Sequence, residues 1–248
     1  KIGEKKYVKH VIYGVVLAIA LSIGLAYIFE LLLGGFEGRF EEVFEGSVML
    51  LAVLVLTYMI FWMNRQAKNI KSDIEVSVES AIDKGRVFSL LFLGFIVVFR
   101  EGAETVLFFR AISYQVNSTE LIIGGMVGIL SSVVLAVIFF VSTIKVNLSA
   151  FFKFTGILIM LIAAGLFSTA IHEFQEAGIL PVIKNDIYDL GNILSKDSIA
   201  GGILKSLFGY NPSPSFLETV GYIVYILIIA LLIGKFYFKN FEYKVEKK

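Results

Sequence analysis

The 248-residue sequence has no cysteine, three prolines, two histidines and few charged residues. The absence of cysteine excludes disulfide bonds, thiolate metal ligands and cysteine nucleophiles. Asp, Glu, Lys and Arg make up 17% of the chain, whereas an ordinary soluble domain has about 25%. Hydrophobic residues take their place and account for 57% of the sequence. This composition is typical of a protein that crosses a membrane several times, and the net charge of +1 gives no sign of a nucleic-acid partner.

Long apolar stretches predict an all-α, polytopic membrane helix bundle in which residues 1–248 form a single transmembrane domain. About 20 apolar residues suffice to cross a hydrocarbon core of about 30 Å, and six stretches reach that length. The predicted spans cover residues 10–33, 43–63, 87–113, 121–141, 151–173 and 216–238.

Two connections carry elements of their own. Apolar residues recur at every fourth position from Ile70 to Ile82, so an amphipathic helix at the membrane surface is predicted over residues 66–84. Residues 177–215 contain all three prolines, and their Ile and Leu residues predict one or two short helices that lie on the protein.

The distribution of lysine and arginine predicts the orientation of the chain. These residues gather in the N-terminal arm, in the connection at residues 64–86 and in the C-terminal tail, whereas the first connection has only Arg39 and the third has none. By the positive-inside rule, both termini are expected in the cytoplasm and the protein in the cytoplasmic membrane.

Three ionisable residues near the centre of the third span are the most informative feature of the sequence. Arg100, Glu101 and Glu104 lie within Phe-Arg-Glu-Gly-Ala-Glu, at a depth where charge costs several kcal/mol unless it faces protein, water or an ion. The i, i+3 spacing of the two glutamates places them on one helix face, where both can offer oxygens to one cation. Arg100 is expected to act as a countercharge, and a salt bridge that only fixes helix packing is the competing explanation.

A second acidic group is predicted at the outer ends of the spans. His172, Glu173 and Glu176 repeat the Glu-x-x-Glu spacing with a histidine added, a donor set that suits iron, manganese or zinc. Glu45, at the start of the second span, is a further candidate metal ligand. A solvated helix end would explain the first three residues equally well, and a helix-end acid favoured by the helix dipole would explain Glu45.

Other chemistries have little support in the sequence. His172-Glu173 opens like the zinc protease motif His-Glu-x-x-His, but Glu176 stands where the second histidine would be. The sequence has no phosphate-binding glycine loop, no nucleophile elbow and no basic stripe for nucleic acid. An enzyme is therefore not expected, and neither is an organic cofactor.

These motifs resemble those of the oxidase-dependent high-affinity iron permeases, the iron/lead transporter family. The central motif matches the Arg-Glu-x-x-Glu signature of that family at Arg100, Glu101 and Glu104. The other matching segments are Phe44 to Met63, His172 to Pro181 and Phe208 to Ser215. The resemblance covers nearly the whole chain, in order.

The resemblance implies a fold of two inverted three-helix repeats plus a final helix, seven helices in all. The first family helix carries another Arg-Glu-x-x-Glu, and this chain begins where the second would begin, so its six spans correspond to helices two to seven. The segment from Arg39 to Glu42 is expected to lie in a loop and not to replace the missing motif.

The function implied by the resemblance is transport of iron into the cell, with iron as substrate and an oxidase or an extracytoplasmic iron-handling protein as partner. Iron would enter at Glu45, His172, Glu173 and Glu176 and pass to Glu101 and Glu104 at the midplane. A membrane-embedded metalloenzyme that uses the His172 group and a non-transporting subunit are the alternatives.

Overall fold

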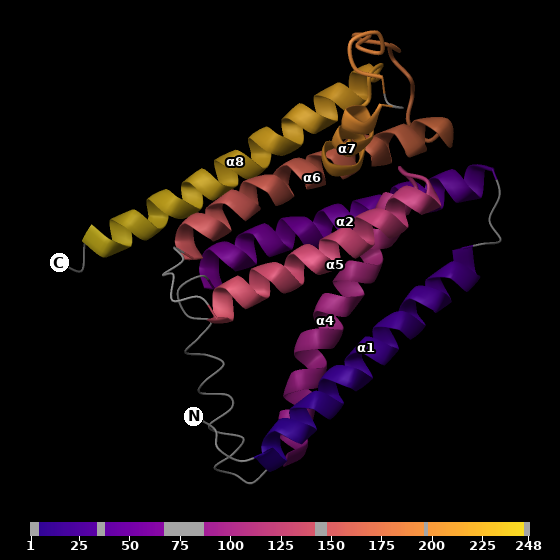
Figure 1. Ribbon diagram of the computed structural model, residues 1–248. Coiled ribbons are helices and arrows are strands. Elements are labelled where there is room, and N and C mark those ends of the chain that lie inside the picture. Colours follow the sequence, from indigo (N-terminus) through magenta and orange to yellow (C-terminus); the bar gives the residue numbers. More distant parts are fainter. Residues whose placement is uncertain (1–4, 34–37, 67–86, 142–147, 196–197, 246–248) are drawn as a thin grey trace. The chain divides into compact units, whose positions relative to one another are not determined.

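The computed structural model describes residues 5–33, 38–66, 87–141, 148–195 and 198–245, and every regular element among them is a helix (Figure 1). The helices are α1 (Lys5–Leu33), α2 (Arg39–Gln66), α4 (Val87–Ser113), α5 (Ser118–Val141), α6 (Leu148–Glu176), α7 (Ile199–Phe208) and α8 (Phe216–Val245). The all-α, polytopic fold class predicted from composition is confirmed. The amphipathic helix predicted over residues 66–84 lies, beyond Gln66, outside the described residues.

Five of the described helices are long and apolar enough to cross a membrane, namely α1, α2, α5, α6 and α8. Each includes a predicted span and extends past it, because polar residues at helix ends continue the helix beyond the apolar stretch. The remaining long helix, α4, has the predicted bounds of 87–113 but carries four charged residues, Arg100, Glu101, Glu104 and Arg110. Its membrane crossing and the single domain over residues 1–248 stay predictions.

The beginning of α2 corrects one expectation. Residues 39–42 were expected in a loop, but α2 begins at Arg39, and the backbone amides of Glu41 and Glu42 donate to the carbonyl of Gly38 at 2.8 and 3.2 Å. Acidic residues in a first turn interact favourably with the positive end of the helix dipole. The prediction failed because it followed hydrophobicity, which starts only at Val43.

The chain divides into two compact units, of which the first comprises residues 1–37 and 66–110. Within it, α1 and α4 run in the same direction and approach closely at glycines. A Cβ on Gly14 would collide with the carbonyl oxygen of Leu91, and a Cβ on Gly102 with the hydroxyl of Ser22. Such small residues allow membrane helices to pack closely. Close packing matters there because the hydrophobic effect does not drive helices together within lipid.

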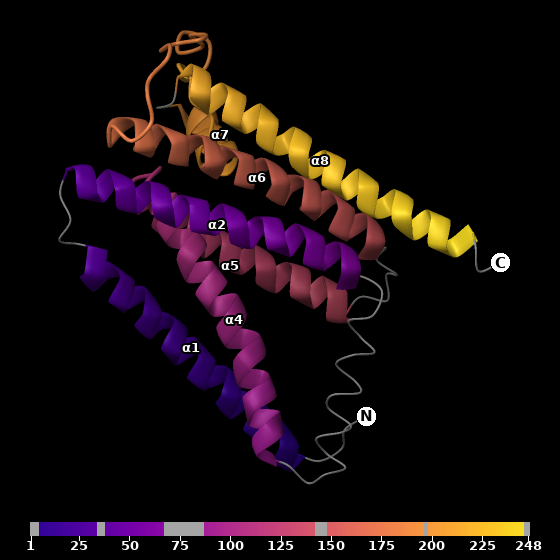
Figure 2. The ribbon, with the colours of Figure 1, turned by 180° about the vertical axis from the view of Figure 1, so that it is seen from behind.

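The second unit comprises residues 38–65 and 111–248. Its centre is the antiparallel pair of α6 and α8, which lie side by side in both views (Figures 1 and 2). Phe167 of α6 packs against Tyr225 of α8, with ring centroids 5.8 Å apart and ring planes tilted by 30°. The helix α2 joins the pair through Thr57, whose hydroxyl lies 2.7 Å from that of Tyr225.

The short helix α7 confirms the prediction of a helix between residues 177 and 215. Ser198 caps its start by accepting a hydrogen bond from the amide of Gly201 at 3.0 Å. Gly209, in the left-handed conformation with φ 63°, ends it, and the amide of Tyr210 donates back to the carbonyl of Leu204 at 3.2 Å. These are the usual signals for a helix start and a helix end.

The contact of α7 with α6 depends on glycine and can be tested. A Cβ on Gly165 of α6 would collide with the backbone of Phe208 and Gly209, whereas a Cβ on Gly156, in the same helix, would meet nothing within 4 Å. We expect Gly165→Ala to lower the free energy of unfolding by about 1–3 kcal/mol, as overpacking does. Thermal unfolding in detergent measures the effect, with Gly156→Ala as the matched control. Equal melting temperatures for both variants would contradict this packing.

Candidate functional site

The central motif lies in α4, in the first unit. The Arg100 guanidinium donates from Nε to Oε1 of Glu104 at 3.0 Å, and its Nη2 lies 4.0 Å from Oε1 of Glu101. One guanidinium therefore lies within ion-pair distance of both carboxylates, and the shorter contact is the i, i+4 pair with Glu104 that helix geometry favours. The predicted grouping of these residues along the helix is present.

The two carboxylates differ in exposure. The Glu104 side chain is 14% exposed and that of Glu101 57%. The second oxygen of Glu104, Oε2, is buried and accepts no hydrogen bond in the part of the chain that the structure describes. Because buried carboxylate oxygens are almost always satisfied, an oxygen without a donor needs an explanation. Gly102, which directly follows Glu101, brings Ser22 of α1 against the motif.

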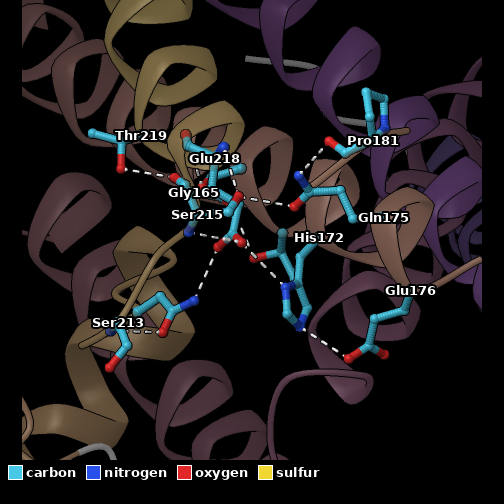
Figure 3. A network of polar contacts seen from close by, with 12 residues as sticks. Gly165, His172, Gln175, Glu176, Pro181, Ser213, Ser215, Glu218 and Thr219 are labelled. Atoms are coloured by element: carbon cyan, nitrogen blue, oxygen red, sulfur yellow. Dashed lines mark hydrogen bonds and ion pairs between the residues drawn. The ribbon is translucent and has the colours of Figure 1, made fainter. Parts of the chain in front are cut away.

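The outer acidic group lies near the end of α6, in the second unit. Each ring nitrogen of His172 faces a carboxylate: Nδ1 lies 3.2 Å from Oε1 of Glu218, and Nε2 lies 3.3 Å from Oε1 of Glu176 (Figure 3). Carboxylates only accept hydrogen bonds, so the ring satisfies both contacts at once only when it is doubly protonated. When the ring is neutral and donates from Nδ1 to Glu218, Nε2 offers a lone pair beside Glu176. That arrangement is common where histidine binds a metal.

Glu218 is the one residue of this group that the sequence analysis did not name. Its side chain is 4% exposed, and besides His172 its carboxylate accepts from Asn211 Nδ2 at 2.9 Å and from the amide of Ser215 at 3.2 Å. The amide of Glu218 donates in turn to the Ser215 hydroxyl at 3.3 Å. Ser215 and Glu218 thus form a capping box at the start of α8.

The network continues from the capping box into α6 and the following loop. The Ser215 hydroxyl donates to Oε1 of Gln175 at 2.8 Å, and Nε2 of Gln175 donates to the carbonyl of Pro181 at 3.2 Å. Ser168 of α6 donates to the backbone carbonyl of Glu218 at 3.2 Å. Figure 3 shows Gln175 and His172 of α6 lying beside Ser215 and Glu218 at the start of α8. The network fixes the C-terminal end of α6 to the start of α8.

The two remaining predicted ligands lie on α6 and α2. Glu173 is half-buried and interacts electrostatically with His172 and Glu176, with Glu42 of α2 and with Lys205 of α7. Glu45 is also half-buried, and it precedes Gly46, whose Cα packs against the ring of Phe174. The N-terminal part of α2 therefore brings acidic residues to the same end of the second unit as His172.

The described residues contain no group of three His, Asp or Glu side chains close enough to hold a metal ion. The structure brings Arg100, Glu101 and Glu104 together in one unit, and His172, Glu176 and Glu218 in the other. It does not gather Glu45, Glu173 and His172 around one point. The predicted metal-binding roles of all these residues stay predictions.

Comparison with known proteins gives a consistent set of matches. A family profile described as "Iron permease FTR1 family" matches residues 1–245. The chain is 36% identical over 216 residues to the ferrous iron permease EfeU of Escherichia coli O6:K15:H31 (strain 536 / UPEC), a match that covers 86% of this chain and 78% of that protein. It is 34% identical over 222 residues to the EfeU of Yersinia pestis, with 89% and 78% covered.

One further relative has a bearing on activity. The protein of Escherichia coli (strain K12) named "Putative inactive ferrous iron permease EfeU" matches at the same 36% identity over 216 residues, again with 86% and 78% covered. No solved structure matches this chain. The matches are to permeases, so the expectation of a transporter and not an enzyme is confirmed.

Proposed function

Because this chain belongs to the Iron permease FTR1 family, we propose that it moves iron across the cytoplasmic membrane into the cell. The observation that carries the proposal is the family match over residues 1–245, which includes every candidate ligand. Ferrous iron is the proposed form, because the relatives are named ferrous iron permeases.

The proposed path uses carboxylates at two depths. Glu45, His172, Glu173 and Glu176 receive the ion at the outer side, and Glu101 and Glu104 bind it within the membrane. The buried Oε2 of Glu104, which accepts no described hydrogen bond, supports the second step. When no iron is present, the Arg100 guanidinium supplies the positive charge that keeps Glu104 ionised. A cation that binds both carboxylates takes over this role and displaces Arg100 from Glu104.

Transport by the purified chain tests this proposal. We expect proteoliposomes that contain the protein and an iron-quenched dye to accumulate Fe²⁺ faster than protein-free liposomes, under anaerobic conditions. Folding and insertion are verified in the same preparation by protease protection. Uptake equal to that of protein-free liposomes, with correctly inserted protein, would contradict the proposal.

An extracytoplasmic partner is part of the proposal. An oxidase or another iron-handling protein would deliver iron to the acidic outer end of α6. We expect co-expression of such a partner to raise uptake at low iron concentrations, and we expect the increase to depend on Glu176, the exposed acid of that group.

The proposed orientation leads to a labelling prediction that the sequence makes simple to test. Since the chain has no cysteine, single cysteines can be introduced without removing others. We expect Asn185→Cys, in the exposed loop after α6, to react with an impermeant maleimide on intact spheroplasts. Lys248→Cys should react only after lysis. The reverse pattern would show that the C-terminus lies outside, and the cysteine-free parent is the control for both.

A non-transporting subunit is the second candidate, favoured by the direct ion pair of Arg100 with Glu104. If this ion pair only stabilises the fold, a double-mutant cycle with Arg100→Gln and Glu104→Gln will show strong coupling in the free energy of unfolding, while iron uptake stays unchanged. If the pair belongs to the transport path, both variants will lose uptake.

A further inference from the structure

A groove in the second unit lies between α2, α6 and α8, and none of its lining residues belongs to the acidic group around His172. It has a volume of about 440 Å³ and is lined mainly by apolar residues, including Ile60, Phe152, Met160 and Ile233. Lys153 is the one charged residue among its described lining residues. All three helices are among those long and apolar enough to cross a membrane.

The charge is placed at one end of the groove. Lys153 is exposed and lies at the start of the apolar span of α6, which covers residues 150–176. Lys235, also exposed, ends the span of α8 and directly follows the lining residue Gly234. Met160 lies about 10 Å deeper along α6, at 1.5 Å per residue. The groove therefore has a basic mouth at the membrane interface and an apolar interior.

Two glycines keep the groove open. A Cβ on Gly156 of α6 or on Gly234 of α8 would meet nothing within 4 Å, although both residues line the groove. This differs from Gly165, where the neighbouring backbone fills the space. Glycine is unfavourable within a helix unless its lack of a side chain serves a purpose, and here none of the described residues occupies the space that it leaves.

We propose that this groove binds one anionic phospholipid of the cytoplasmic leaflet, with an acyl chain along Gly156 and Gly234 and the phosphate at Lys153. The leaflet follows from the proposed orientation, in which α6 begins and α8 ends at the cytoplasmic side. Basic pockets between membrane helices on that side are suited to anionic head groups. A volume of this size also falls within the range of small-molecule sites, about 300–1,000 Å³.

Native mass spectrometry of the full chain in detergent tests the proposal, with dioleoyl phosphatidylglycerol and dioleoyl phosphatidylcholine as probes. We expect one phosphatidylglycerol to bind more tightly than phosphatidylcholine. Lys153→Gln should weaken phosphatidylglycerol binding about five-fold and leave phosphatidylcholine unchanged. The double variant Gly156→Leu/Gly234→Leu, which fills the groove, should weaken both lipids about tenfold.

Gly124→Leu is the matched control, because Gly124 on α5 also has open space around it but lies outside the groove. Equal affinities for both lipids in the parent, unchanged by Lys153→Gln, would overturn the proposal. So would a dimeric parent that becomes monomeric in the leucine double variant, since a second copy would then cover the groove. Should that variant fail to fold, Lys153→Gln alone decides, and iron uptake is measured separately so that the two proposals fail independently.

Discussion

Replacing Glu104 with glutamine is expected to reduce iron uptake about tenfold or more, the loss that follows when one charged ligand of a buried cation is neutralised. The side chain keeps its size and can still accept from Arg100, so the helix packing around it is retained. What disappears is the negative charge of the carboxylate, whose buried oxygen Oε2 accepts no described hydrogen bond. Initial rates of ⁵⁵Fe uptake in cells, normalised to the amount of protein in the membrane, measure the effect.

Two further variants sharpen this prediction. Glu101→Gln should also lower uptake, because Glu101 is the second carboxylate that faces the Arg100 guanidinium. Glu120→Gln should leave uptake unchanged, since Glu120 is an exposed acid that caps α5 through the amide of Asn117, and glutamine can serve the same purpose. Wild-type rates in Glu104→Gln at normal expression would remove the central motif from the path.

Replacing Glu218 with alanine is expected to be among the most damaging single changes for stability. It removes a buried acceptor from Asn211, from the Ser215 amide and from His172. Donors left without an acceptor in a buried site, together with a broken ion pair, should lower the free energy of unfolding by about 3 kcal/mol. The capping box that starts α8 is lost with them.

Thermal unfolding in detergent measures this effect, and two variants make it specific. Glu218→Gln should have an intermediate melting temperature. The glutamine side chain keeps one acceptor oxygen, but its NH2 group replaces the other oxygen and points at groups that are themselves donors. Glu176→Ala should change the melting temperature little, as the Glu176 side chain is 56% exposed and its ion pair with His172 is solvent-screened. A parent-like melting temperature for Glu218→Ala would contradict the structural role of the network.

Hydrophobicity alone predicted most of the fold, and two helices show where it succeeded and where it failed. The bounds of α4 coincide with the predicted span of 87–113, since polar residues flank the apolar stretch closely on both sides. The start of α2 was missed because Arg39, Glu41 and Glu42 form a helical turn that a search for apolar residues passes over. A search for helix-start signals, with acids after the left-handed Gly38, would have found it.

The candidate site was predictable where it depends on spacing along one helix and not where it depends on packing between helices. Arg100, Glu101 and Glu104 share a turn of α4, so their proximity follows from helical geometry. Glu218 meets His172 only because α6 and α8 pack against each other, across 46 residues of sequence. The Ser215-x-x-Glu218 pattern is typical of a helix start, but nothing in it indicates a histidine partner.

The central claim is that Glu101 and Glu104 together bind the transported ion, and equilibrium binding tests it most directly. Purified protein is titrated with ⁵⁵Fe²⁺ under anaerobic conditions, and the parent is compared with the Glu101→Gln/Glu104→Gln double variant and with Glu120→Gln. The account predicts that the double variant alone binds one iron ion fewer per chain. The same iron stoichiometry and affinity in all three proteins would contradict it.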